Sequence, residues 1–334
     1  MSLPATPGPV AAPLAALAIA VALDLAVAEP PARVHPVALF GSVVGRVDRE
    51  WARPGLVGGA AAVGLPLLAA AVAAGAVWAA AGVGPRVGVD PRLLAVPVAG
   101  ALLFSTVSLR MLRDVTAEVV ALTESDPDAA RESVRALVGR DAADLSPAAL
   151  RSAAVESATE NLADGFVAPL TGFAAGATVG LAVGGPGAVL PLAAGVAGAA
   201  WAKGVNTLDS MLGYRSKPVG RASARLDDAV MYLPARATAG CLAVAAGSVG
   251  ALARARSWAG EPASPNSGWP MATAAAALDV RLAKPGHYAL NPTAAAPSVA
   301  DAERAVRLVG VAGGVAVAGA AGWLAAVAGV VAWS

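Results

Sequence analysis

The feature that most constrains this chain is the separation of its charged residues from long apolar runs. Of its 334 residues 57% are hydrophobic and only 14% are charged, whereas soluble proteins average about 45–50% and 25%. A helix of about 20 apolar residues crosses the hydrocarbon core of a bilayer. We expect membrane spans at 11–28, 56–83, 93–109, 166–183, 188–202, 229–253 and 305–333. The pattern predicts an all-α fold: a polytopic integral membrane helical bundle that forms a single membrane-embedded domain over residues 1–334.

The charged residues are concentrated between these runs. They lie mainly in the segments 29–55, 110–164, 203–236 and 254–307. Within the second segment, Asp126-Pro127 and Ser146-Pro147 are typical of helix starts, because proline is favoured at the first helical position. We therefore expect 110–164 to be a soluble helical insertion rather than a further span.

The distribution of cations predicts the orientation of the chain. Segments 29–55 and 110–164 are rich in Lys and Arg, and such segments stay in the cytoplasm. We expect a multi-pass protein of the cell (plasma) membrane, in contact with the lipid bilayer, with a cytoplasmic active site. A span at 229–253 would place the cations of 254–307 outside. Because Pro234 and Arg236 interrupt that run, we interpret it as lying partly in protein.

The bulk numbers exclude several classes of function. The net charge of +1 gives no support for nucleic-acid binding. With one cysteine, Cys241, no intrachain disulfide can form, and with only His35 and His287 a multi-histidine zinc site is not expected. The chain has none of the common phosphate-loop, dinucleotide-binding, nucleophile-elbow or zinc-protease motifs.

Three carboxylates precede the apolar run 166–183 at intervals of four residues. Glu156, Glu160 and Asp164 would stack along one face of a helix, where like charges repel unless a cation lies beside them. Oxygen ligands of this kind suit Mg²⁺, which often bridges carboxylates and phosphates. The alternative is a solvated acidic face, but ionisable residues that run directly into a span are functional candidates.

A second group follows the run 188–202. In it, cations able to pair with phosphate alternate with the polar and acidic residues Asn206 and Asp209. The candidate phosphate-binding and substrate-binding residues here are Lys203, Asn206, Tyr214, Arg215 and Lys217. A plain cytoplasmic loop would explain the cations but not Asn206 and Asp209.

A third group contains adjacent carboxylates. Because Asp227 and Asp228 point to different faces of a helix, we expect them to have separate roles, one binding a metal and the other pairing with Arg225 or capping a helix. An acidic helix start is the alternative. Two weaker signals are His35, in a proline-rich loop, and the turn containing Asn266 and Trp269, whose ring can stack on a flat ligand or pack.

Taken in order, these motifs resemble the CobD/CbiB family of cobalamin biosynthesis, the membrane-bound adenosylcobinamide-phosphate synthases. The resemblance spreads from about residue 19 to 290. The matching motifs are His35-Pro36-Val37, Gly139-Arg140-Asp141, Val155-Glu156-Ser157, Glu160 to Gly165, Pro169, Asn206 to Arg215, Ala224 to Asp228, Pro234-Ala235-Arg236 and Pro265 to Pro270. The chain departs from the family at Ala28-Glu29-Pro30, where Gly-Asp-Pro is expected, at Ala142, where threonine is common, and in a shorter stretch between Arg215 and Arg225.

The resemblance implies an enzyme that joins adenosylcobyric acid, a corrinoid, to aminopropanol phosphate or aminopropanol through an amide bond, using ATP. Activation of the carboxylic acid and binding of the nucleotide phosphates would suit Mg²⁺. The expected metal ligands are Glu156, Glu160, Asp164, Asp209 and Asp227. The expected catalytic residues are Glu160, Asp164, Asp209 and His35. The expected substrate-binding residues are Lys203, Asn206, Tyr214, Arg215, Lys217, Arg225, Arg236, Asn266 and Trp269.

Other interpretations remain open at this point. Intramembrane carboxylates in a glycine-rich bundle also suit a transporter of a polar or anionic solute, although no inverted repeat is visible. A membrane prenyltransferase would carry aspartates in a DxxxD spacing, which these motifs do not follow. The chain could also be a purely structural subunit. As partners we expect the two substrates and a homo-oligomer or other membrane proteins of the corrinoid pathway.

Overall fold

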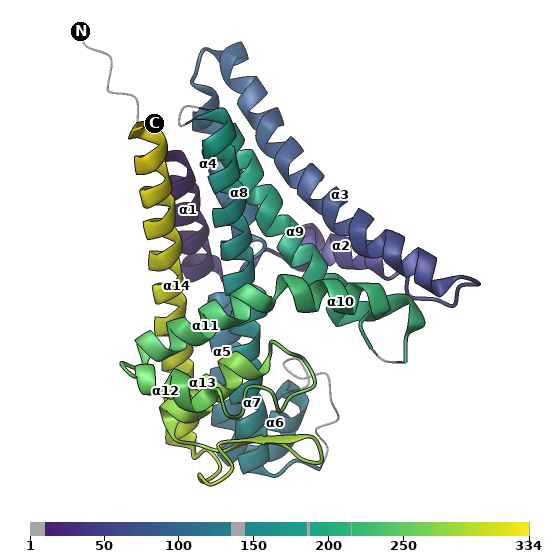
Figure 1. Cartoon of the computed structure of the whole chain (residues 1–334), viewed down its shortest axis with the longest axis vertical. Helices are drawn as coiled ribbons and strands as arrows, with labels where there is room; N and C mark the ends of the chain where they lie inside the picture. Colours follow the sequence, from purple (N-terminus) through teal and green to yellow (C-terminus); the bar gives the residue numbers. More distant parts are fainter. Residues whose placement is uncertain (1–10, 135–143, 186–187, 215, 334) are drawn as a thin grey trace. The chain divides into compact units, whose positions relative to one another are not determined.

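The computed structural model describes residues 11–134, 144–185, 188–214 and 216–333, and most of these are helical (Figure 1). The α-helices are α1 (Ala11–Val27), α2 (Pro36–Val44), α3 (Pro54–Val83), α4 (Pro91–Phe104), α5 (Leu109–Ser125), α6 (Pro127–Val134), α7 (Pro147–Leu162), α8 (Ala168–Gly184), α9 (Leu190–Leu212), α10 (Arg221–Val230), α11 (Tyr232–Ala245), α12 (Val249–Ala255), α13 (Gly268–Leu278) and α14 (Val299–Trp333). Strands β1 (Leu282–Lys284) and β2 (Tyr288–Leu290) form one antiparallel hairpin. The predicted all-α, membrane-type helical bundle is confirmed.

Local side-chain capping explains where the helices of the charged segment begin. Helix α7 starts at Pro147, and the Ser146 hydroxyl accepts a hydrogen bond from the Ala149 amide at 3.3 Å. Helix α6 starts at Pro127, and the Asp126 carboxylate accepts a hydrogen bond from the Ala129 amide at 3.0 Å. Both predicted helix starts are confirmed. The helices begin at these positions because the capping side chains accept hydrogen bonds from amides that have no partner within the helix.

Four helical segments of the described chain are long and apolar enough to cross a membrane. They are Pro54–Val87, Pro91–Ser125, Pro147–Gly184 and Val299–Trp333. Helix α1 is apolar but has only 17 residues. The run 229–253 is divided between α11, with 14 residues, and α12, with 7. Each of these is shorter than the roughly 20 residues that a span requires.

The chain forms two compact units. Unit 1 comprises Met1–Ser108, Ala168–Ala229 and Val317–Ser334, and unit 2 comprises Leu109–Val167 and Val230–Ala316. Each unit has its own packed helices.

Unit 1 is built around α8 and α9, which lie side by side (Figure 1). Glycines line their contact: a Cβ atom on Gly172 would collide with the carbonyl of Gly198, and one on Gly176 with the carbonyl of Ala194. Gly180 continues this row at the same interval of four residues. Small residues at this spacing let helix backbones approach closely, as expected from the composition of the spans.

Helix α1 packs on α4. The chain that follows α1 leads into the loop before α2. The one carboxylate of α1, Asp24, is 1% exposed and so lies in protein. Ala28, directly after the helix, has a φ of 68°, in the left-handed region that favours glycine. This accounts for the glycine that the CobD/CbiB pattern has at this position. The turn places Glu29 beside the loop before α2.

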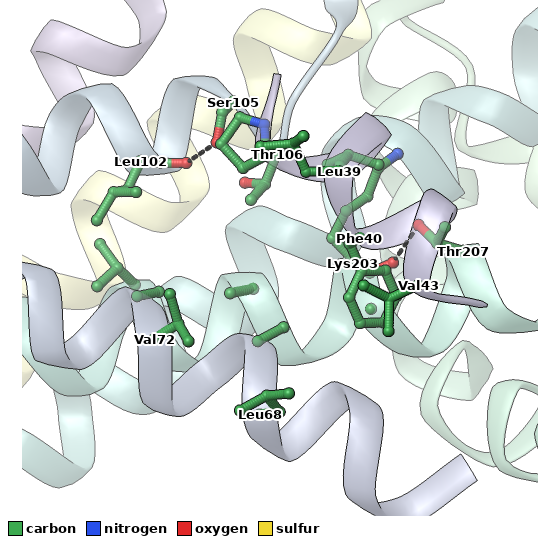
Figure 2. Close-up of a pocket in the computed structure, with 17 residues that line it drawn as sticks. Leu39, Phe40, Val43, Leu68, Val72, Leu102, Ser105, Thr106, Lys203 and Thr207 are labelled. Atoms are coloured by element: carbon green, nitrogen blue, oxygen red, sulfur yellow. Dashed lines mark hydrogen bonds between the residues drawn. The ribbon is translucent and has the colours of Figure 1, made fainter. Parts of the chain in front are cut away.

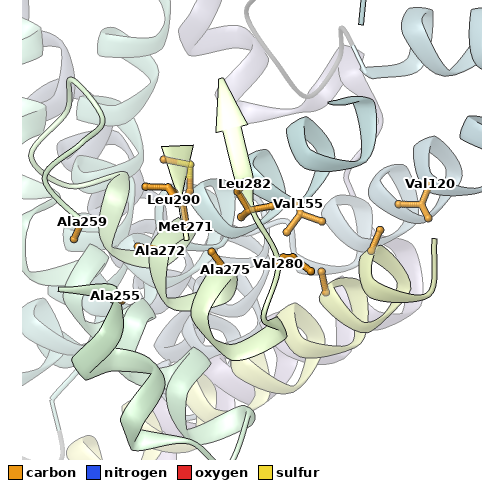
Figure 3. Packing of buried hydrophobic residues seen from close by; sticks show 12 residues of the cluster. Val120, Val155, Ala255, Ala259, Met271, Ala272, Ala275, Val280, Leu282 and Leu290 are labelled. Atoms are coloured by element: carbon orange, nitrogen blue, oxygen red, sulfur yellow. The ribbon is translucent and has the colours of Figure 1, made fainter. Parts of the chain in front are cut away.

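The core of unit 2 is a cluster of small and aliphatic side chains from α5, α7, α12, α13, α14 and the hairpin (Figure 3). Val155 of α7 packs in this cluster with Leu282 and Leu290, which face each other across the hairpin. The hairpin is therefore fixed against α7, with polar residues of both elements alongside the apolar contact.

Candidate functional site

A polar cavity of about 420 Å³ opens in unit 1 where the loop before α2, the C-terminal end of α4 and the middle of α9 meet. Its ionisable side chains are Glu29, His35 and Lys203. Both Glu29 and Lys203 are close enough to His35 to interact with it electrostatically. The cavity therefore contains an anion, a cation and an imidazole, drawn from segments that are far apart in the sequence.

His35 is held by the start of α2. Its Nδ1 accepts a hydrogen bond from the Val37 amide at 3.2 Å, so the proton of the neutral ring is on Nε2. Burial lowers the pKa of His35, Lys203 lowers it further, and Glu29 partly opposes them. A neutral ring with Nε2 protonated offers the cavity a hydrogen-bond donor.

The cavity hydroxyls are oriented by their own helices. Ser105, Thr106 and Thr207 donate to carbonyls three or four residues earlier, at 2.7, 2.7 and 2.8 Å. Because their protons are engaged, these oxygens present lone pairs, and they suit a ligand that donates hydrogen bonds.

A second cavity, of about 310 Å³, adjoins the first and is almost entirely apolar (Figure 2). It shares Ser105, Thr106, Lys203 and Thr207 with the polar cavity and continues between α2, α3, α4 and α9. Leu68 and Val72 line it and remain more than half exposed, and both belong to α3, which is long and apolar enough to span a membrane.

A further candidate site residue of unit 1 is Asp209, which lies near the C-terminal end of α9. A Cβ atom on Gly213 would collide with the Asp209 carboxylate, so glycine is needed there to leave room for it. The Oδ1 atom of Asp209 is buried, with no hydrogen-bond partner among the described residues. Burial raises the pKa of Asp209, and the negative charge of Asp228 raises it further. The two carboxylates thus lie near each other, as they would around a cation.

Other predicted residues of unit 1 have structural contacts of their own. Lys217 donates to Asp48 at 2.7 Å and to the Met211 carbonyl at 2.9 Å, and it lies over the Tyr214 ring. Asn206 and Asp227 are half-buried, and Arg225 is exposed on α10. Arg215 and the Gly139-Arg140-Asp141 motif lie outside the described residues.

In unit 2, Glu156 is the centre of a buried hydrogen-bond network. Its carboxylate accepts from the Ser152 hydroxyl at 2.7 Å and from the Tyr288 hydroxyl at 2.6 Å. The Ser152 oxygen in turn accepts from the Ala283 amide at 2.9 Å. Each carboxylate oxygen of Glu156 has a protein donor, so this side chain ties the hairpin to α7.

Glu160 and Asp164 are half-buried beside a change in helix type. Glu160 interacts electrostatically with Asp164, Glu156 and Lys284, so Lys284 is the cation expected beside the acidic face. A π-helix runs over Ala163–Val167, and it interrupts the interval of four that a regular helix would give Asp164. Such π segments frequently occur at functional sites.

Three predicted residues come together around Arg236 of α11. Its guanidinium donates to the Asn266 side-chain oxygen and to the Tyr232 carbonyl, both at 2.8 Å. It also lies 3.6 Å from the centre of the Tyr232 ring and 5.2 Å from that of Trp269. The loop before α13 is thus attached to α11 through one cation.

The structure adds residues that the sequence motifs did not identify as site members. The sequence motifs include Asp228 without a specific role, and they do not include Tyr288, Ser152 or Lys284. The Lys284-Pro285-Gly286 turn signal predicts a hairpin, but only the fold shows that Tyr288 reaches α7. In the described residues, no group of three or more His, Cys, Asp or Glu side chains could hold a metal ion.

The chain is similar to known proteins over most of its length. The family model described as CobD/Cbib protein matches residues 17–317. A probable cobalamin biosynthesis protein CobD of Methanothrix thermoacetophila is 34% identical over 312 residues, covering 89% of this chain and 92% of that protein. The cobalamin biosynthesis protein CobD of Rhodobacter capsulatus is 36% identical, with coverages of 88% and 92%, and that of Mycobacterium tuberculosis is 36% identical, with 83% and 85%. No solved structure matches the chain.

Proposed function

The chain belongs to the CobD/CbiB protein family, and from this premise we propose that it is an amide-forming enzyme of cobalamin biosynthesis in the cell membrane. Its substrates are adenosylcobyric acid, ATP and either aminopropanol phosphate or aminopropanol, and its product is adenosylcobinamide phosphate or the unphosphorylated analogue. The observation that carries this proposal is the family match over residues 17–317. The four helices able to span a membrane support the location.

Amide formation requires that the carboxylate be activated. In the proposed reaction, a corrinoid carboxylate oxygen attacks the γ-phosphorus of ATP, which gives an acyl phosphate and ADP. The amine nitrogen then attacks the acyl carbon, which gives the amide, inorganic phosphate and one proton. The chain has to bind the anionic phosphates, accept that proton and keep water away from the acyl phosphate.

Asp209 and Asp228 fit a Mg²⁺ site that uses few protein ligands. Mg²⁺ commonly binds one or two carboxylates and completes its shell with water and substrate phosphates. The buried, unsatisfied Oδ1 of Asp209 and the nearby Asp228 carboxylate are donors of this kind. A bound Mg²⁺ would neutralise the nucleotide phosphates. Asp227, the residue adjacent to Asp228, remains a further candidate ligand.

Proton transfer is assigned to a carboxylate rather than to His35. Because Nδ1 of His35 accepts from the Val37 amide, the ring can donate through Nε2 but cannot accept there. We propose that a carboxylate accepts the proton, and the candidates that the sequence motifs supply are Glu160, Asp164 and Asp209.

Variants of single carboxylates test this assignment. Purified Asp209→Asn and Glu160→Gln should lose amine-dependent ADP release from ATP and adenosylcobyric acid while they still fold in membranes. Asp128→Asn is a matched control, since that carboxylate is 94% exposed in a surface pair, and it should retain wild-type turnover. Full activity in both variants would contradict the assigned roles. Solute uptake into proteoliposomes without any product would favour a transporter instead.

A further inference from the structure

The polar cavity of unit 1 presents opposite charges to a single ligand. Glu29 supplies a carboxylate, and Lys203 supplies an ammonium group from α9. Both interact with His35, which lies in the same wall. A small zwitterion is complementary in charge to both groups, whereas a ligand of one charge sign is complementary to only one of them.

The hydrogen-bonding groups of the cavity fall into the same two kinds. The oxygens of Ser105, Thr106 and Thr207 have their protons engaged by backbone carbonyls and therefore accept. Together with a carboxylate they suit an ammonium ion, which only donates. The Lys203 ammonium and the His35 Nε2–H donate, and they suit a phosphate, which accepts.

We propose that this cavity binds an amino-alkyl phosphate as a zwitterion, with its phosphate on Lys203 and His35 and its ammonium on Glu29 and the three hydroxyls. The proposal rests on the proposed function, since it gives a binding site for the amine substrate and selects the phosphorylated amine over the free one. The volume of about 420 Å³ leaves room for such a molecule with ordered water.

The same chemistry can come from two sources. One is the free amino-alkyl phosphate, and the other is the head group of an ethanolamine phospholipid. The apolar cavity next to Lys203, partly lined by exposed side chains of α3, could take the acyl chain of a lipid (Figure 2). A substitution in the apolar cavity therefore separates the two sources.

Calorimetric titration of the purified full chain in detergent, without ATP or corrinoid, tests the proposal independently of turnover. O-phosphoethanolamine should bind wild type, Lys203→Gln should weaken it about tenfold or more, and Lys203→Arg should keep most of the affinity. Free ethanolamine should bind more weakly than O-phosphoethanolamine and should be insensitive to Lys203→Gln. Glu29→Gln should weaken both ligands. Equal binding of O-phosphoethanolamine by wild type, Lys203→Gln and Glu29→Gln would overturn the proposal.

The second arm identifies the source. Ala200→Phe fills the apolar cavity that Ala200 lines and leaves the polar one intact. If the natural ligand is free, the variant binds O-phosphoethanolamine like wild type, and lysophosphatidylethanolamine adds no affinity in either protein. If it is a lipid, lysophosphatidylethanolamine binds wild type more tightly and loses that gain in Ala200→Phe. No binding of either ligand by wild type would overturn the site, whereas turnover lost with binding retained would count against the proposed reaction alone.

Discussion

Replacing Tyr288 by phenylalanine tests whether Glu156 holds the hairpin to α7. The tyrosine hydroxyl is the donor to one oxygen of a carboxylate that is 4% exposed. A buried acceptor that loses its partner costs about 1–3 kcal/mol, and more when it is charged. We therefore expect Tyr288→Phe to lose about 2–3 kcal/mol of stability, since the ring itself is kept.

The single cysteine provides the assay. Cys241 is half-buried on α11 of the same unit, so a thiol-reactive fluorophore reports its exposure as the detergent-solubilised protein unfolds on heating. Domains of 150–250 residues lose about 2–4 °C of Tm per kcal/mol, which gives an expected fall of about 4–12 °C. Tyr232→Phe is the control, because the Tyr232 side chain is exposed and its stacking on Arg236 needs only the ring.

A double-mutant cycle with Glu156→Gln isolates the contact. If the hydroxyl and the carboxylate interact as described, the two changes together should cost less than their sum, with a coupling of about 1 kcal/mol or more. Additive effects, or a Tyr288→Phe protein that melts with wild type, would refute the structural role. Wild-type melting of Glu156→Gln combined with lost turnover would instead support Glu156 as a metal ligand.

Three further substitutions give separate tests. Gly213→Ala should displace the Asp209 carboxylate and reduce turnover at least tenfold with little change in Tm. Unchanged turnover would contradict the inference that glycine is needed at position 213 to leave room for that carboxylate. Gly176→Leu should separate α8 from α9, because its side chain meets the Ala194 carbonyl, and should lower the yield of folded protein after detergent extraction, measured by size-exclusion chromatography. His35→Asn should keep the α2 cap but remove a component of the pH dependence of stability. Because the pKa of His35 in the folded protein lies below 6.5, wild type should lose stability as the pH falls below about 6.5. Identical profiles of Tm against pH for both proteins would contradict the lowered pKa.

The sequence predicts much of the fold because the relevant signals are local. Apolar runs of the sequence become α3, α4, α8 and α14, which lie in the four segments long and apolar enough to span a membrane. The proline-marked starts of α6 and α7 appear where expected. The glycine row that begins at Gly172 was visible as composition, although its partners on α9 were not. The type of helix is less predictable, since nothing local indicates that a π-helix replaces the regular helix over Ala163–Val167, the segment that contains Asp164.

The sites were predictable only in part because their partners are distant in sequence. Arg236, Asn266 and Trp269 were identified from separate motifs and do come together. By contrast, Tyr288 reaches Glu156 across more than a hundred residues, and no spacing rule indicates that pairing. The choice between adjacent aspartates likewise needs the fold, which places Asp228 in electrostatic contact with Asp209.

The central claim is that this chain joins a corrinoid acid to an amine at the expense of ATP. The most direct test is to incubate the purified protein in detergent with adenosylcobyric acid, ATP, Mg²⁺ and either aminopropanol phosphate or aminopropanol, and to measure the corrinoid product by mass. We predict a product heavier by the amine minus one water, formed with one ADP per amide and formed faster with the phosphorylated amine. A corrinoid of unchanged mass, from folded protein with all substrates present, would contradict the account.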